Sequence, residues 1–324
     1  MLIMIKGHEP FKLDVKERKI LAELDSNSRK SLQEISKKVG LSKEAVFHRI
    51  KNLEEKKIVT GYTLLVSLAK LGFMQIKLMI KLQNVTKNIK ENMIIYLKNQ
   101  KKVQWLVSCV GNYDLMIGFV VRNLDEFYKI KNELFNKYSG YFLNEEISIM
   151  IEGKAHGRKY LGKSPKTIHY IGEKKEVDIK KKDLEILKLL SKNARTSVVG
   201  IAEKLNLTPR IVAYKIKQFE KKGIITGYTI SINHELLGIS YFKSLIYLRK
   251  NNEKIIDFLE NQKNCVYNVL ALASWNLEPE FEVYSNEDFY RIGDEMQDLF
   301  GDDIKTINNI LITKEHKFDT FPSL

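Results

Sequence analysis

The sequence predicts an α+β protein built from two copies of one two-domain unit. A segment that begins at Ile35 recurs at Ile201, 166 residues later, and the run Ile58–Thr63 recurs at Ile224–Thr229. In both copies, a region of alternating apolar runs and helical patterns follows in the same order. A repeat of this length indicates duplicated domains rather than a solenoid unit. We therefore predict an intrachain pseudo-dimer.

Residues from about 15 to 56 predict three short helices, because apolar residues recur there at helical spacing. Ser31 and Glu34 form a capping box at the start of the second helix, Gly40 ends that helix, and Ser42 caps the third. A β-rich stretch follows the third helix, and we expect it to form a two-stranded wing. The apolar positions are Ile20, Leu21 and Leu24, then Leu32, Ile35 and Val39, then Val46, Ile50 and Leu53.

The second copy repeats this pattern, with Thr208 as the cap of its third helix and Pro209 at the first helical position. Both copies therefore predict a winged helix-turn-helix module. The corresponding apolar positions are Ile186, Leu187 and Leu190, then Val198, Ile201 and Leu205, then Val212, Ile216 and Phe219.

The regions at about 73–152 and 239–315 each show the order βαββαβ, which predicts two ferredoxin-like α+β domains. The two helices would cover one face of each sheet, and the other copy would cover the second face. We expect helix-turn-helix domains at 1–66 and 177–232, βαββαβ domains at 67–152 and 233–324, and a linker at 153–176. Basic residues of the linker, including Lys154, Arg158 and Lys159, would either touch phosphate or be solvated.

The formal charge of +14 predicts a polyanionic partner. Residues 1–80, 81–172 and 173–232 each carry a net charge of +7, whereas residues 233–324 carry −7. Both helix-turn-helix segments are therefore basic and the last domain is acidic. The alternative is a lysine-rich chain with solvated basic faces, which would not explain the acidic segment.

The two cysteines, Cys109 and Cys265, each lie in an apolar run, which predicts buried thiols in a reducing compartment. The six histidines and two cysteines show no metal-ligand spacing, so we expect no metal and no cofactor. We see no convincing signal peptide and no apolar run near the roughly 20 residues of a membrane helix. We therefore expect a cytoplasmic protein without a membrane partner.

These motifs resemble the leucine-responsive and asparagine-responsive (Lrp/AsnC) transcription regulators of archaea and bacteria. Their pattern is a winged helix-turn-helix domain followed by an effector-binding βαββαβ domain, often called RAM. The resemblance covers nearly the whole chain, twice. It implies a sequence-specific DNA-binding regulator of transcription with double-stranded DNA as partner and an amino acid as effector, and no catalytic residue. The matching residues are Leu41, Ser42, Val46, Arg49, Ile50, Leu53, Glu54, Ile58, Thr60, Gly61 and Tyr62, with Gly111, Asn112, Tyr113, Asp114 and Leu115.

The residues Gly111, Asn112, Tyr113 and Asp114 look like the family's Gly-x-Tyr-Asp-Leu signature, which lies near the amino-acid site at subunit contacts. The resemblance therefore implies effector binding by this loop. The second copy has Ala273, Trp275 and Asn276 at the corresponding positions, which puts a second effector site in doubt. The alternative is structural, with Gly111 permitting a tight turn that Asp114 caps.

The third helix of each module is the expected DNA-reading element, because its buried stripe leaves the opposite face for the major groove. Steps of 100° from Val46 place Glu44, His48 and Lys51 on the far side, with Phe47 at the flank. The second copy offers Arg210, Tyr214 and Lys217 instead. Since arginine pairs with guanine and glutamate accepts from cytosine, we infer an operator with two unlike half-sites.

We expect further side chains to position the modules on the DNA backbone. The alternative for each of them is a solvated surface group. The best candidates are Ser42, Lys43, Arg49, Thr208 and Lys215, followed by Arg29 and Arg195, which precede the second helix of each module.

Two alternative functions remain open. The same architecture resembles siroheme decarboxylases, but those carry His and Arg in a strand where this chain has Val103–Ser108 and Cys265–Leu270, without a titratable acid or base for proton transfer. Alternatively, the winged helices could dock a protein instead of DNA. The basic charge of both modules argues against the second alternative.

Overall fold

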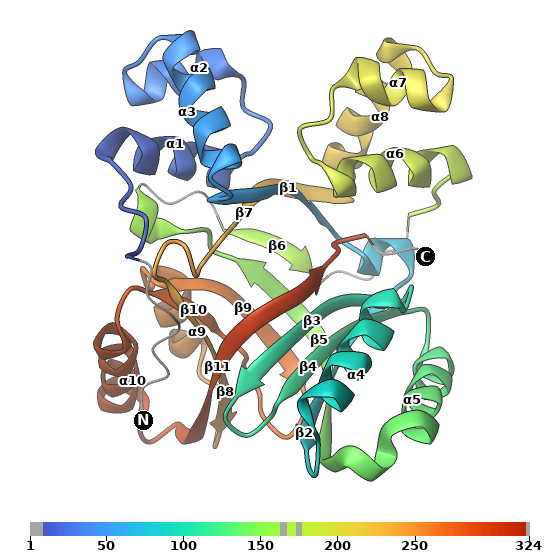
Figure 1. Ribbon diagram of the computed structural model, residues 1–324, viewed down its shortest axis with the longest axis vertical. Coiled ribbons are helices and arrows are strands. Elements are labelled where there is room, and N and C mark those ends of the chain that lie inside the picture. The colour runs from blue at the N-terminus through green and yellow to red at the C-terminus, as the bar shows by residue number, and fades with distance from the viewer. Residues whose placement is uncertain (1–8, 163–166, 173–176, 322–324) are drawn as a thin grey trace.

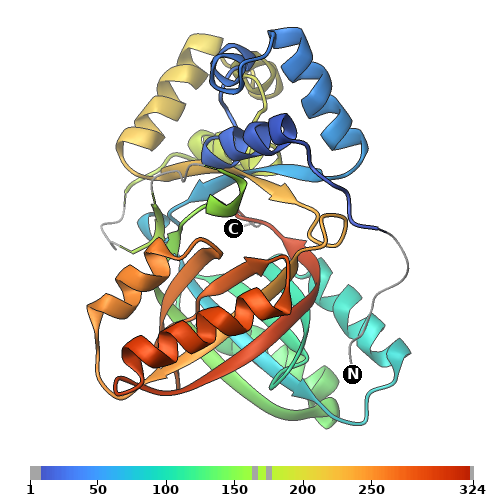
Figure 2. The same ribbon diagram turned by 90° about the vertical axis from the view of Figure 1, so that its left-hand side faces the viewer.

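A computed structural model describes residues 9–162, 167–172 and 177–321 of the chain. Two helical modules lie at one end of the molecule, above a two-stranded ribbon, and a β-barrel with helices on its outside forms the other end (Figure 1). The view in Figure 2, turned by 90°, shows the same arrangement. The α+β class and the duplication are therefore confirmed.

The first module consists of α1 (Val15–Ser26), α2 (Leu32–Val39) and α3 (Lys43–Glu55). The predicted capping box is present, since the Ser31 side chain accepts from Glu34 N–H and the Glu34 side chain accepts from Ser31 N–H. Gly40 ends α2 in the left-handed region at a φ of 65°. These local contacts satisfy the helix ends, so the sequence patterns there determine the helix boundaries.

The second module consists of α6 (Lys181–Lys192), α7 (Val198–Leu205) and α8 (Pro209–Lys221). As predicted, Thr208 caps α8 by accepting from Ile211 N–H, and Pro209 occupies the first turn. Asn206 takes the left-handed place that Gly40 has in the first module, at a φ of 50°.

The expected two-stranded wing within each module is wrong. Each module instead contributes one strand, β1 (Val59–Val66) or β7 (Ile225–Ile232), and these two strands pair antiparallel with each other. Thr63 lies opposite Thr229 near the middle of this ribbon. The physical reason is that the strand after each third helix continues directly toward the barrel, so its hydrogen-bonding partner comes from the other copy.

The two βαββαβ units together form one closed eight-stranded barrel. Their sheets are joined edge to edge by hydrogen bonds, instead of only facing one another as expected. Each unit forms a four-stranded antiparallel sheet, and the edges of the two sheets pair as β3 with β11 and as β5 with β9. A further strand, β6 (Ile168–Ile171), pairs antiparallel with the C-terminal end of β5. The strands are β2 (Met74–Leu82), β3 (Val103–Val110), β4 (Leu115–Val121) and β5 (Phe142–Ala155), and in the second copy β8 (Ser240–Leu248), β9 (Cys265–Leu272), β10 (Glu280–Val283) and β11 (Ile304–Phe318).

Helices cover the outside of the barrel, on opposite flanks in Figure 1. They are α4 (Lys87–Asn99) and α5 (Leu124–Tyr138) in the first copy and α9 (Glu253–Asn261) and α10 (Asn286–Phe300) in the second. Each copy has a separate apolar cluster between its sheet and its helices. Short 3-10 turns at Ala69–Leu71, Ser139–Tyr141 and Lys159–Leu161 complete the described elements.

Much of the described part of the predicted linker belongs to strands and turns of the fold. Residues 163–166 and 173–176 of this segment lie outside the described residues. β5 continues through Ala155, past the expected boundary at residue 152. Arg158 is 7% exposed and pairs with Asp25 of α1 and Glu282 of β10, with N–O distances of 2.7 and 2.9 Å. The expected phosphate contact or solvated tether is therefore wrong for Arg158, because two carboxylates of the folded interior hold it.

Two arginines join the helical modules reciprocally. Arg29 donates to the carbonyls of Ala194 and Thr196, and its guanidinium lies 5.5 Å from the centre of the Tyr228 ring. Arg195 donates to Ser28 O at 2.7 Å, and its guanidinium lies 5.2 Å from the Tyr62 ring centre. The structure thus gives both arginines a contact with the opposite module, where we expected contacts with the DNA backbone.

Among the residues that the structure describes, no helix is long and apolar enough to cross a membrane. The same described residues contain no group of three or more His, Cys, Asp or Glu side chains placed to hold a metal ion.

Both thiols are expected to resist modification in the folded protein. Cys109 and Cys265 are 2% and 0% exposed, and burial raises the pKa of Cys109 to about 12 and that of Cys265 still further. Because the thiolate is the nucleophile, neither should react with an aromatic disulfide reagent at pH 8, whereas both should react in denaturant. Rapid modification of one thiol per folded chain would contradict the described packing.

Replacing one of the two arginines that join the modules, Arg29 or Arg195, should destabilise the junction between them. We expect Arg195→Ala to lower the free energy of unfolding by about 1–2 kcal/mol, since a hydrogen bond from a charged donor to a half-buried carbonyl is lost. Urea denaturation measures this change, and Arg210→Ala, at an exposed helix position, is the matched control. Equal stability of the two variants would show that the Arg195 contacts contribute nothing to the free energy of unfolding.

Candidate nucleic-acid interface

Helix α3 buries one stripe and exposes the opposite one, as its sequence predicts. Val46, Ile50 and Leu53 are 0%, 6% and 0% exposed and pack in the core of the first module. On the other side, the predicted reading residues are exposed: they are Glu44, Phe47, His48 and Lys51, with Lys43 in the first turn. The edge of one ring meets the face of the other between Phe47 and His48, with ring centres 5.5 Å apart.

Helix α8 has the same arrangement with different chemistry. Val212, Ile216 and Phe219 are buried against the second module. The predicted reading residues Arg210, Tyr214 and Lys217 are exposed, and Tyr214 exposes 60% of its surface. The outer face of each third helix therefore carries both charged and aromatic groups, which are the groups that contact phosphates and base edges.

Ile211 is a candidate contact residue that the sequence interpretation missed. It lies in the first turn of α8 and is 43% exposed. The signal was available, because a residue directly before the buried Val212 is turned about 100° from the buried stripe. An exposed apolar side chain at this place suits contact with a thymine methyl group.

The hydroxyl groups predicted to touch phosphate are also the helix caps. Ser42 accepts from Ala45 N–H at 3.1 Å, and Thr208 accepts from Ile211 N–H at 3.3 Å. The Thr208 hydroxyl still has its own hydrogen to donate, whereas the Ser42 hydroxyl donates to the Glu44 carboxylate. Caps of this kind lie at helix N-termini, whose partial positive charge attracts anions.

Two predicted positioning residues are held by carboxylates within their own modules. Arg49 pairs with Asp14 at 2.5 Å, and Lys215 pairs with Asp183 at 3.1 Å. Asp14 has its pKa lowered by the Glu17 backbone N–H and then by Arg49. Both pairs join the third helix to the first helix of the module, so these cations orient the reading helix.

At one matching first-turn position, α3 carries an acidic side chain and α8 a basic one. Glu44 has a pKa below its usual value, because the N–H groups of its own helix end and the Ser42 hydroxyl bind its carboxylate. The counterpart region of α8 carries Arg210. A base or phosphate that meets the two helices would therefore meet different charges.

The four predicted effector residues, Gly111–Asp114, form the turn between β3 and β4. Gly111 adopts a φ of 136°, and a Cβ there would lie 3.0 Å from Asn309 O of the second copy. Asp114 accepts from Leu82 N–H at 2.9 Å, and Tyr113 is only 2% exposed. Burial and a hydrogen bond to Glu146 raise the pKa of Tyr113. The turn thus lies at the contact between the copies, and its acidic and aromatic side chains are used within the fold.

The corresponding loop of the second copy repeats one of these contacts. Asn276 accepts from Leu248 N–H at 2.9 Å, as Asp114 does from Leu82 N–H. Trp275 is 1% exposed and donates to the Glu278 carboxylate at 2.9 Å. The contact shared by both copies is structural, whereas Trp275 and Glu278 belong to the second copy alone.

Comparisons with known proteins agree with this arrangement. A family described as winged helix-turn-helix DNA-binding matches residues 13–60 and 179–226. The regulator LrpA of Pyrococcus horikoshii is 40% identical over 85 residues, which are 26% of this chain and 60% of that protein, so the chain spans less than two thirds of it. The regulator Ptr1 of Methanocaldococcus jannaschii is 30% identical over 124 residues, which cover 37% of this chain and 80% of that protein.

A solved structure resembles the chain over nearly its whole length. The crystal structure of the siroheme decarboxylase NirDL covers 94% of this chain and 93% of its own, with a TM-score of 0.62 and 10% identity. At that identity the likeness concerns the fold alone, namely two helical modules joined to one barrel. From the sequence relatives and the duplicated module, the chain belongs to the Lrp/AsnC family of helix-turn-helix transcription regulators, with both halves of the pair fused in one polypeptide.

Proposed function

We propose that the chain binds specific double-stranded DNA through α3 and α8 and thereby regulates transcription. The observation that carries this proposal is the pair of exposed faces with charged and aromatic groups on two capped third helices at the same end of the molecule. Such a helix fits the major groove, and residues that flank it hold the phosphates.

The separation of the two modules is constrained by contacts that cross between them. The ribbon of β1 and β7 and the reciprocal bonds of Arg29 and Arg195 connect them directly. Two modules with a fixed spacing select half-sites with a matching spacing. The proposed target is therefore one bipartite operator for each chain.

The two half-sites are proposed to be unlike. A symmetric homodimer presents the same side chains twice, whereas this chain presents Glu44 and His48 on one helix and Arg210 and Tyr214 on the other. Arginine prefers the O6 and N7 atoms of guanine, and a glutamate accepts from the amino group of cytosine. Selection of bound fragments from genomic DNA would give the sequence and symmetry of the operator.

An amino-acid effector at Gly111–Asp114 is part of the proposal and rests on the family resemblance. The place of the turn at the contact between the copies supports it, because a ligand there would touch both halves. Any larger homo-oligomer would be built from this fused pair. With DNA as partner, the proposed site of action is the cytoplasm.

The proposal includes no catalytic activity. Strands β3 and β9 carry no His, Arg, Asp or Glu at Val103–Ser108 or Cys265–Leu270, where the siroheme decarboxylases that the chain resembles carry His and Arg. The titratable groups of these segments, Cys265 and Tyr267, have pKa values raised by burial, which does not suit them to proton transfer. Incubation with siroheme should leave the absorbance spectrum of the pigment unchanged. Protein docking by the helical modules is the other alternative, and binding that ignores salt would favour it.

The salt dependence of DNA binding tests for phosphate contacts. Lys217→Ala should reduce the slope of log K against log salt concentration by about 1, because one fewer counterion is released. Lys51→Ala should have a similar effect in the first module. Fluorescence anisotropy with a labelled operator measures the slope, and Lys129→Ala, exposed on α5, is the matched control. If the slope stays the same while base preference changes, the lysine reads bases.

Substitution of one reading residue tests the asymmetry. Arg210→Ala should weaken binding by about 1–3 kcal/mol and relax base preference in one half-site only. Glu44→Ala should change preference in the other half-site. Binding to operators with single base changes measures both effects. Equal changes at symmetry-related positions for both variants would refute unlike half-sites.

A further inference from the structure

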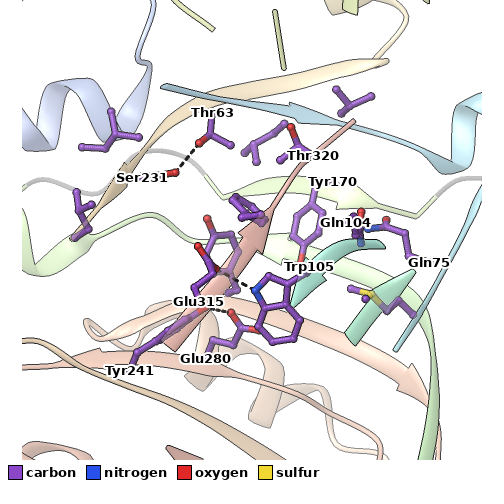
Figure 3. Close-up of a pocket in the computed structure, with 18 of the residues that line it drawn as sticks. Thr63, Gln75, Gln104, Trp105, Tyr170, Ser231, Tyr241, Glu280, Glu315 and Thr320 are labelled. Atoms are coloured by element: carbon purple, nitrogen blue, oxygen red, sulfur yellow. Dashed lines mark hydrogen bonds between the residues drawn. The ribbon is translucent and has the colours of Figure 1, made fainter. Parts of the chain in front are cut away.

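A cavity of about 120 Å³ lies between the β1–β7 ribbon and the barrel (Figure 3). Thr63 and Ser231 of the ribbon form one side and share a hydrogen bond of 2.9 Å. Trp105 of β3, Glu315 of β11 and Tyr241 of β8 lie across from them in Figure 3. None of the four predicted effector residues lines this space, so it is separate from the turn between β3 and β4.

Glu315 differs from the other carboxylates of the wall because it has no ion pair with a described residue. Its carboxylate accepts from the Trp105 indole N–H at 3.0 Å, and no ion pair with a described cation is present. More than a third of its surface is accessible, because the side chain faces the cavity and its mouth. Burial raises the pKa of Glu315, while the indole hydrogen bond lowers it.

The other carboxylates inside the barrel have cationic partners. Glu280 pairs with Lys243 at 2.6 Å, and Glu282 pairs with Arg158 at 2.9 Å. The cavity wall contains three carboxylates, those of Glu280, Glu282 and Glu315, and only the first two have these ion pairs. Glu315 is therefore the wall carboxylate that is left without an ion pair to a described cation.

The rest of the wall suits an organic cation. Aromatic rings surround the space, and their faces attract positive charge. An engineered apolar cavity of about 150 Å³ binds benzene, so this cavity is near the size needed for a single ring or a short alkyl chain. The aromatic side chains are those of Trp105, Tyr170, Tyr241, Tyr267 and Phe318.

A second chamber of about 320 Å³ adjoins the cavity and provides a mouth. The two spaces share Thr63, Ser231, Glu315, Phe318 and Thr320. The outer chamber is lined by Lys192 and Lys317. Because these side chains are cationic, the outer end of a ligand would be neutral or anionic.

The two copies differ at this mouth. On the first side, Asp25 pairs with Arg158. The repeat places Ser191 at the position of Asp25. The bonds of His156 N–H to Val266 O and of Asp319 N–H to Gln104 O mark matching backbone positions, so Phe321 takes the place of Arg158. The ion pair of the first side is thus replaced on the second by Ser191, which lines the outer chamber, and by the apolar Phe321.

We propose that this cavity binds a small organic ammonium compound, with its cationic end against the Glu315 carboxylate and its apolar part among the aromatic rings. The inference does not rest on DNA binding, and its test contains no DNA. The wall is nevertheless connected to the first helical module, because Arg158 bonds both Glu282 in the barrel and Asp25 at the end of α1.

Isothermal titration of the full chain with three probes of one shape tests the charge requirement. The probes are benzylamine, benzyl alcohol and benzoate, at a pH where the amine is protonated. We expect benzylamine to bind about tenfold to a hundredfold more tightly than the alcohol, as one charge-assisted hydrogen bond provides, and benzoate not to bind. Equal binding of amine and alcohol, or preferred binding of benzoate, would overturn the proposal.

Substitution places the binding site. Glu315→Gln keeps the shape but removes the charge, and it should weaken benzylamine binding by the same factor, whereas Glu287→Gln on the exposed face of α10 should not. If Glu315→Gln does not fold, the wild-type chain still provides a test through tryptophan fluorescence. Trp105 lies in the wall and Trp275 does not, so benzylamine should change the emission of the wild-type chain but not that of Trp105→Phe. Binding that both glutamine variants retain, or an emission change that persists in Trp105→Phe, would refute the site.

Discussion

Strand pairing between the two halves of the chain is the constraint on which the other features depend. β3 pairs with β11 and β5 with β9, so neither four-stranded sheet has a free edge at these seams. β1 pairs with β7 in the same way beneath the helical modules. A single half would expose three unpaired strand edges and one open face of its sheet. Each half of the chain therefore needs the other half in order to fold.

The same frame lets the two halves differ. In a homodimer each substitution occurs twice, but here the first module has an ion pair between Asp25 and Arg158 where the second has Ser191 and Phe321. The first module is joined to the barrel by buried charges, whereas Phe321 packs in the apolar core of the second. Divergence of this kind accounts for both the unlike outer faces of α3 and α8 and the different groups at the mouth of the cavity.

Local chemistry made much of the fold predictable. The caps at Ser31, Ser42 and Thr208 and the buried stripe around Val46 depend on residues within a few positions of each other, and all appear as expected. The order βαββαβ follows from periodicity alone. The exposed reading faces follow from the buried ones, because a helix has a fixed turn per residue.

The features that could not be predicted depend on contacts between distant residues. Arg29 precedes a helix as a phosphate-binding residue would, but its partners lie 165 and 167 positions away. Arg158 occurs in a basic, irregular segment, and only the closed barrel brings Glu282 to it. The prediction of a two-stranded wing is wrong for the same reason. The sequence of a strand does not show whether its hydrogen-bonding partner is the next segment or a strand of the other copy. The cavity at Glu315 arises from both copies and from the ribbon together.

We propose that one chain acts as a complete, asymmetric pair of DNA-reading modules. Stoichiometric titration combined with hydroxyl-radical footprinting, on a fragment selected from genomic DNA, tests it most directly. We expect one chain per operator and two protected segments of different sequence on the same face of the duplex. Protection of a perfect inverted repeat, or of one segment only, would contradict it.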